Sequence, residues 1–198
     1  MTERFSSDVR RRDAFTIVEM IIVLATILVL AGLVLATSGY VRNKGKRSRA
    51  EVEIAAISVA LENYKADNGI YPIDTVAGTT ATLDARTMLN PTVPEYGAAS
   101  VFLYKQLSGD LIGNRIPTGK SYFTFPPRML SPSNQTQIVT AIADPFGFSY
   151  GYSTANQSNP VKGYNPTFDI WSTGGTGTDL SPVPSPGSIP QDQWIKNW

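Results

Sequence analysis

The chain has 198 residues, of which 17% are charged and 42% are apolar, and its formal charge is +1. A charge so close to zero provides no overall positive field to attract nucleic acid. The sequence contains neither Cys nor His, which excludes disulfides, thiolate nucleophiles, Cys/His zinc sites and the usual neutral-pH general base.

The two ends of the chain differ in charge and in proline content. The first 49 residues hold nine Lys or Arg against four acids, whereas the remaining 149 hold eight against twelve. All fourteen Pro residues lie at Pro72 or later. Because a Pro inside a helix costs about 3 kcal/mol, the Pro-free part can form one long helix. The later part must consist of turns and short elements.

The segment from Phe15 to Ala36 reads FTIVEMIIVLATILVLAGLVLA, and Glu19 is its only charged residue. As a helix these residues extend about 33 Å, enough for the roughly 30 Å hydrocarbon core of a bilayer. The segment has no polar stripe, unlike a typical core helix. It is also long for a secretory signal, and no small-x-small cleavage site follows it. We therefore expect residues 15–37 to form a membrane helix.

Basic residues flank this apolar segment on both sides. Arg10, Arg11 and Arg12 precede it, and five Lys or Arg residues lie between Arg42 and Arg49. The preference of Lys and Arg for the cytoplasmic side would, on this count, place the C-terminal part inside. The residues by themselves leave the orientation open.

Glu19 is the most informative residue of the apolar segment. A carboxylate within a bilayer costs about 2.5–3.5 kcal/mol and needs a partner, yet no Lys or Arg lies within the segment. Glu19 could reach the nearby interface or become neutral there. Alternatively its partner comes from another chain, and an α-amine at Phe15 of a neighbouring copy would be a suitable cation. On that hypothesis Glu19 and Phe15 direct assembly.

The helical pattern continues beyond the apolar segment. Ile54, Ile57, Leu61 and Tyr64 recur at spacings of three, four and three, which places them on one face of a helix. The sequence Asp-Asn-Gly at residues 67–69 predicts the helix end. We therefore expect an amphipathic helix over residues 38–69, with this face packed in the core of the domain that follows.

Residues 70–198 are expected to form a globular α+β region with a Pro/Gly-rich C-terminal loop. Residues 101–107 are typical of a short helix, and residues 121–125 alternate like a strand. Residues 144–152 favour an aromatic hairpin, and residues 164–171 another strand. These elements predict a small antiparallel sheet packed on the long N-terminal helix.

The N-terminal residues resemble the processing site of type IV prepilins. The features that carry the resemblance are the short basic leader, Ala14 in place of the usual Gly, and the hexapeptide FTIVEM at residues 15–20. The resemblance implies that residues 1–14 are a leader peptide, and that a prepilin peptidase cleaves between Ala14 and Phe15 and methylates the new amine. It also implies a cytoplasmic leader and a periplasmic C-terminal domain, anchored in the bacterial inner membrane before filament assembly.

Three further segments resemble the major pseudopilin of type II secretion. They are LENYKADNGIYP at residues 61–72, DPFGFSYGY at residues 144–152 and FDIWS at residues 168–172. The resemblance implies a pilin-like fold and a non-enzymatic subunit that polymerises through its N-terminal helix into a pseudopilus, which supports protein export across the outer membrane. The implied partners are further copies, minor pseudopilins, the prepilin peptidase and an inner-membrane platform protein, with no nucleic acid.

Two other functions stay open. The chain could be a major or minor pilin of a type IV pilus, used in adhesion, motility or DNA uptake. It could instead be an enzyme anchored by a single span, although no nucleophile–base pair or metal triad stands out in the sequence.

Calcium is the one cofactor that the sequence suggests. Hard cations need clustered oxygen atoms, and Gly-rich backbone can offer carbonyls. Asp179 and Asp192 bracket the Pro-rich segment, and related pseudopilins bind calcium in this region. The expected ligands are the carboxylates of Asp179 and Asp192 and backbone carbonyls around Ser172 and Gly175. The alternative is that these carboxylates are simply solvated.

Overall fold

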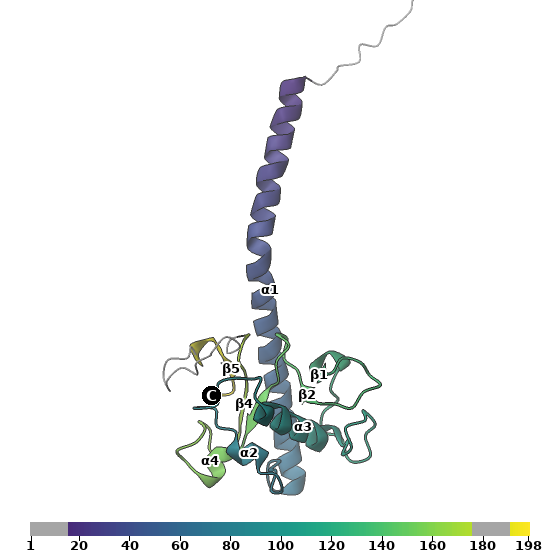
Figure 1. Cartoon of the computed structure of the whole chain (residues 1–198), viewed down its shortest axis with the longest axis vertical. Coiled ribbons are helices and arrows are strands. Elements are labelled where there is room, and N and C mark those ends of the chain that lie inside the picture. The colour runs from purple at the N-terminus through teal and green to yellow at the C-terminus, as the bar shows by residue number, and fades with distance from the viewer. Residues whose placement is uncertain (1–15, 176–190) are drawn as a thin grey trace, which may run out of the picture. The chain divides into compact units, whose positions relative to one another are not determined.

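The computed structural model describes residues 16–175 and 191–198, and it shows the predicted α+β architecture. The chain divides into two compact units. The first ends at Asn43 and contains the beginning of a long helix, whereas the second runs from Lys44 to Trp198. In the second unit the remaining helices and all the strands gather around the end of that helix (Figure 1).

The long helix α1 runs from Ile17 to Asn68. It ends where the sequence predicts, because Gly69 adopts a left-handed conformation with φ of 80°. The Gly69 N–H donates to the Lys65 carbonyl at 2.7 Å and so closes the last turn.

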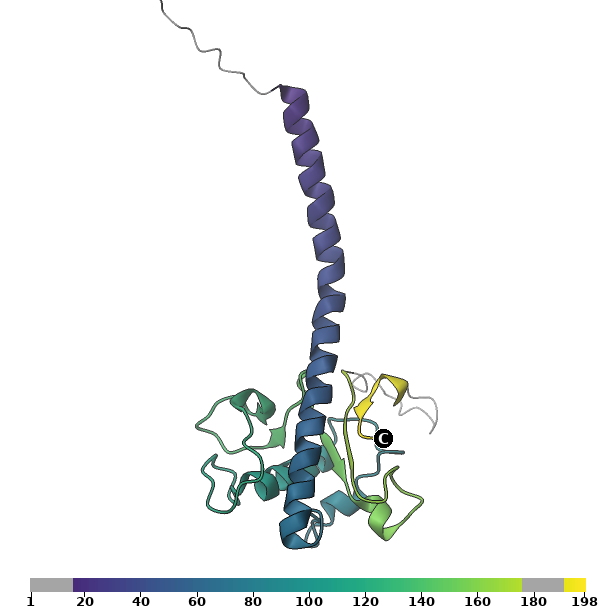
Figure 2. The same ribbon diagram turned by 180° about the vertical axis from the view of Figure 1, so that it is seen from behind.

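The apolar stripe on the second half of α1 packs in the core, as predicted. Ile54, Ile57 and Leu61 are buried, and Tyr64 is partly buried against them. Ala50 and Ala60 are buried in the same cluster. Figure 2, seen from behind, shows that the other elements leave the opposite face of this half-helix uncovered.

Three further α-helices follow within the described residues, of which α3 is the longest. They are α2 (Thr79–Thr82), α3 (Pro94–Ser108) and α4 (Ala155–Ser158). The helix predicted over residues 101–107 is the second half of α3. Pro94 begins α3 at a position where its missing N–H costs nothing, and Gly109 ends it in a left-handed conformation.

The strands that the structure describes form two small antiparallel sheets. The first pairs β1 (Leu130–Ser131) with β2 (Ala141–Ile142) and follows the 3₁₀ helix η1 (Pro127–Met129). The second has the order β3-β4-β5, with β3 at Gly151–Ser153, β4 at Asp169–Ser172 and β5 at Ile195–Lys196, and the 3₁₀ helix η2 (Gln191–Gln193) precedes β5. Tyr152 pairs with Ile170, and Ser172 pairs with Ile195.

Strand β4 separates two apolar clusters, because successive side chains of a strand point to opposite faces. Ile170 belongs to the larger cluster, which includes the buried stripe of α1. Trp171 belongs to a smaller one, where its indole Nε1 donates to the Tyr96 hydroxyl at 3.0 Å. A Cβ atom at Gly151 would overlap the Trp171 ring, so only Gly fits beside this indole.

The strand predicted over residues 121–125 does not form. Instead the N–H groups of Tyr122 and Phe123 both donate to the Leu107 carbonyl, at 2.7 and 3.0 Å, and so cover the last turn of α3. Phe125 packs against Tyr104 of α3, with ring centroids 5.3 Å apart. The alternation of aromatic residues therefore reflects packing on a helix end and not pairing in a sheet.

The other β predictions hold for part of their length. Residues 144–147 form a turn, closed by a bridge between Ala143 and Ser149, and β3 follows at Gly151. Within residues 164–171, only the portion from Asp169 is a strand. The residues before it bend around the Asp169 carboxylate, which accepts the N–H groups of Tyr164 and Asn165 at 2.8 Å each.

Candidate functional site

The first half of α1 presents its apolar side chains to the surroundings. All its large apolar residues from Ile17 to Leu35 are about half exposed or more. None of its most apolar stretch is buried. By length and composition, α1 is long and apolar enough to cross a membrane, the one helix of the described residues that meets this test.

Glu19 lies in the first turn of α1 and is exposed. The Glu19 N–H donates to the Thr16 hydroxyl oxygen at 3.2 Å, and the Met20 N–H donates to the Thr16 carbonyl at 3.2 Å. Thr16 therefore caps the helix, and a negative charge in the first turn is favourable beside the helix N-terminus. Sequence reasoning missed this cap, although Thr-x-x-Glu at residues 16–19 is its signature. Ala14 and Phe15 lie outside the described residues.

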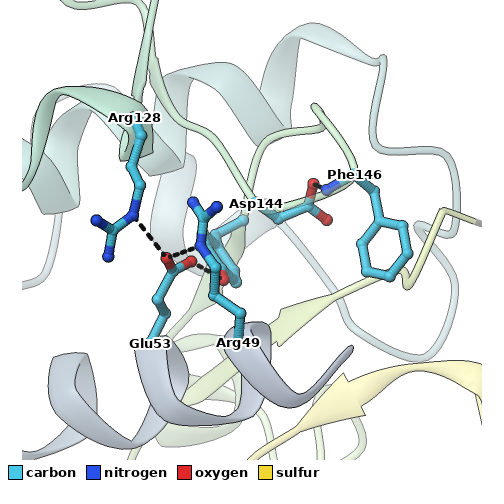
Figure 3. A network of polar contacts seen from close by, with 6 residues as sticks. Arg49, Glu53, Arg128, Asp144 and Phe146 are labelled. Atoms are coloured by element: carbon cyan, nitrogen blue, oxygen red, sulfur yellow. Dashed lines mark hydrogen bonds and ion pairs between the residues drawn. The ribbon is translucent and has the colours of Figure 1, made fainter. Parts of the chain in front are cut away.

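A second polar site lies within the globular unit, where a carboxylate of α1 is buried. Glu53 is 6% exposed. One of its oxygens accepts from Arg49 Nε at 2.7 Å and lies 3.9 Å from Arg128 Nε, while the other accepts from the Tyr150 hydroxyl at 2.8 Å (Figure 3). Burial and the neighbouring Glu53 carboxylate raise the pKa of Tyr150, so this hydroxyl remains a donor.

Asp144 is a second buried carboxylate, at the start of the turn over residues 144–147. Its Oδ1 accepts the N–H groups of Phe146 and Phe148, each at 2.9 Å, and its Oδ2 accepts from the Ser172 hydroxyl at 2.5 Å. Burial raises the pKa of Asp144 above its usual value, although these hydrogen bonds oppose the change. The carboxylate thus joins the turn to strand β4.

The residues expected to bind calcium are only partly placed. Ser172 is buried at the end of β4, and Gly175 is exposed beside the Phe146 ring. Asp192 lies in η2, whereas Asp179 lies outside the described residues. Residues 16–175 and 191–198 contain no group of three or more acidic side chains that could hold a metal. The Asp144 carboxylate beside Ser172 is an oxygen donor of the kind that calcium prefers, and sequence reasoning did not assign it.

Several basic residues after the apolar segment contact their own domain. Arg47 donates through Nη1 to the Gln193 carbonyl at 2.6 Å, and the Lys46 ammonium lies 5.5 Å from the centre of the Phe146 ring. These contacts attach the C-terminal residues and the turn over residues 144–147 to α1, whereas the Arg49–Glu53 ion pair lies within α1 itself. They were not predicted, although Arg and Glu four residues apart on a helix are a recognisable ion-pair pattern.

Comparison with known proteins gives one partial similarity. Over 63 residues, the chain is 35% identical to the type II secretion system core protein G of Aeromonas hydrophila. The aligned region is 32% of this chain and 44% of that protein, so the chain spans less than half the length of this curated relative. No protein-family model and no solved structure matches the chain. The partial similarity supports a pilin-like family and is consistent with the long N-terminal helix and the α+β fold.

Proposed function

We propose that the chain is a non-enzymatic structural subunit of a type II secretion pseudopilus, which polymerises through its N-terminal helix and supports protein export across the outer membrane. The observation that carries the proposal is the exposed apolar first half of α1 with one carboxylate, Glu19, in its first turn. The partial similarity to a secretion-system core protein supports the same assignment.

The apolar half of α1 then has two successive environments. Residues 15–37 anchor the subunit in the bacterial inner membrane, with the leader of residues 1–14 cytoplasmic and the C-terminal domain periplasmic. A prepilin peptidase cleaves after Ala14 and methylates the Phe15 amine. The platform protein and the minor pseudopilins then guide the same apolar surface into the core of a filament, where Glu19 meets the Phe15 amine of a neighbouring copy.

The pair Glu19→Gln and Thr16→Ala tests this proposal. Gln at the third helical position preserves a capping box, so Glu19→Gln removes the charge and keeps the cap. Thr16→Ala removes the cap hydroxyl and keeps the charge. We expect Glu19→Gln to abolish polymers seen by electron microscopy after the full-length chain is expressed and processed, and Thr16→Ala to leave them in place. Both variants should remain in the membrane fraction with unchanged Trp fluorescence.

The reverse pattern, with polymers lost in Thr16→Ala and retained in Glu19→Gln, would show that Glu19 only supports the helix end. Mass spectrometry of the N-terminus checks the processing in the same preparations. An N-methylated Phe15 is the expected result, and a mature chain that begins at Met1 contradicts the proposal.

We also propose that the C-terminal loop binds calcium. Asp179, Asp192 and backbone carbonyls near Ser172 and Gly175 would hold the ion, which would stabilise the loop by neutralising its carboxylates. Calorimetric titration of the full-length chain with Ca²⁺ should give a saturable heat that Asp192→Asn reduces. The idea fails if no heat is released and chelators leave the melting temperature unchanged.

A further inference from the structure

The buried Glu53 borders an open groove on one side of α1. The groove has a volume of about 390 Å³ and lies between α1, strand β1 and the turn over residues 144–147. Its lining includes the cationic Arg49 and Arg128, the buried acid Asp144, the apolar side chains of Leu130 and Phe146, and the exposed Ser133. The groove therefore combines cationic groups with an apolar wall.

The two arginines of the groove lie beside two carboxylates, Glu53 and Asp144. Asp144 already accepts hydrogen bonds from the N–H groups of Phe146 and Phe148 and from the Ser172 hydroxyl. Arg49 and Arg128 approach the same oxygen of Glu53, and both do so through Nε (Figure 3). The other Glu53 oxygen accepts from Tyr150. In the described part of the chain, no hydrogen bond engages the terminal Nη groups of either arginine. Two guanidinium groups thus share one carboxylate, and their Nη groups can bind a second one.

The other side of the same helix carries an exposed acid. Glu51 is two residues from both Arg49 and Glu53, which places it about 200° around the helix from each of them. Val52 and Val59, 69% and 61% exposed, and the exposed Ala55 lie within about 100° of it around the helix. Glu51 therefore lies on an apolar ridge that complements the groove in both polarity and charge.

Glu51 is also the available acid on this half of α1. Glu62 accepts a hydrogen bond from Tyr71, and Asp67 pairs with Lys120. Glu51 has no hydrogen-bond or ion-pair partner within residues 16–175 and 191–198. An exposed, unpaired carboxylate loses little by moving to a site that offers two guanidinium groups.

We propose that Glu51 of one copy docks into the Arg49–Arg128 groove of a second copy of this chain. The inference rests on the proposed function, because it assumes that copies polymerise. The donor and acceptor surfaces lie on opposite sides of α1, so the contact is heterologous and each bound copy presents a free groove to the next. A contact of this type generates an open polymer and not a closed dimer.

Cysteine cross-linking tests the proposed contact directly, because the chain has no Cys of its own. One full-length chain carries Ala55→Cys, one helical turn from Glu51, and a second carries Ser133→Cys, so all the charges are retained. When the two are co-assembled and treated with a short bis-maleimide, we expect cross-linked dimers. Ala55→Cys paired with Val76→Cys, which is 98% exposed and outside the groove, is the matched control and should give few.

Charge reversal supplies a second measurement. Arg128 is suited to it because its side chain is 62% exposed and its Nε lies 3.9 Å from Glu53, farther than the Arg49 Nε at 2.7 Å. We expect Arg128→Glu or Glu51→Arg alone to raise the protein concentration needed for polymerisation roughly tenfold, and the double variant to recover most of that loss.

The outcomes separate this contact from the proposed function. If polymers form but residues 55 and 133 do not cross-link, or the double variant is no better than the single ones, the contact is wrong and the function stands. If the unmodified chain forms no polymer after processing, the proposed function itself fails.

Discussion

Leu28 and Ile57 are apolar residues of the same helix, yet Leu28 is 65% exposed and Ile57 is fully buried. Fully burying a side chain of this size is worth about 1.5–3 kcal/mol. The second half of α1 obtains that energy from its own chain, through the strands and α3. The large apolar side chains of the first half are exposed instead. We propose that lipid and further copies of the chain cover them.

The largest effect on the stability of the fold should come from truncating a side chain of the buried stripe on α1. Ile57→Ala removes three carbons from a site without solvent access and should lower the free energy of unfolding by about 2–5 kcal/mol. Urea unfolding followed by Trp fluorescence measures this change, because all three Trp residues lie in the globular unit.

Val59→Ala, on the exposed face of the same half-helix, is the control and should change the free energy of unfolding by less than about 0.5 kcal/mol. Equal losses for the two variants would contradict the division of α1 into a covered and an uncovered face. Leu28→Ala, in the first half, should leave this transition unchanged.

The features that could be predicted from sequence are those set by neighbouring residues. The stripe at Ile54, Ile57 and Leu61 follows from helical periodicity, and the helix end follows from the conformational freedom of Gly69. Glu19 stands out because a lone carboxylate is costly in an apolar segment. Local patterns failed at residues 121–125, where the same alternation of aromatic side chains serves a helix end and not a strand.

Contacts between distant residues could not be predicted in this way. Arg128 meets Glu53 across 75 positions of sequence, and Ser172 meets Asp144 across 28, so neither pair leaves a local pattern. The number of acidic residues after residue 49 therefore follows from the sequence, but which of them are solvated and which are buried could not be predicted. Which acids are buried determines how the stability of the globular unit responds to pH.

A smaller effect is expected at Asp110, a fully buried acid that organises the loop after α3. Burial by itself raises its pKa, but the N–H groups of Gly113, Arg115 and Asn114 and the Tyr104 hydroxyl donate to the carboxylate and bring the pKa below its usual 3.8. The folded state therefore favours the charged form. Its contribution to stability is present above about pH 4 and is lost as the pH falls through the lowered pKa.

Asp110→Asn should cost about 2 kcal/mol at neutral pH, because an amide offers one acceptor oxygen where the carboxylate offers two. The difference from the unmodified chain should shrink as the pH is lowered from 5 to 3. Measuring that difference by urea unfolding cancels the contributions of the other acids. Asp67→Asn, which removes a surface acid paired with Lys120, is the control. A pH-independent difference in the free energy of unfolding for Asp110→Asn would contradict the assignment.

The smallest expected effect on stability tests the difference between the buried and the exposed face of α1. Glu53→Gln keeps the size of the side chain and one acceptor oxygen for Arg49 or Tyr150, so it should destabilise the fold by about 1 kcal/mol. Glu51→Gln, two residues away and exposed, should not change the free energy of unfolding in detergent. Glu51→Gln should weaken polymerisation more than Glu53→Gln does, because Glu51 contributes its charge to a neighbouring copy. Glu53→Gln instead removes the carboxylate that the two guanidinium groups share, so they carry more positive charge for an incoming acid. If the two substitutions affect stability and polymerisation in the same order, the buried acid and the exposed acid do not have the separate roles assigned to them.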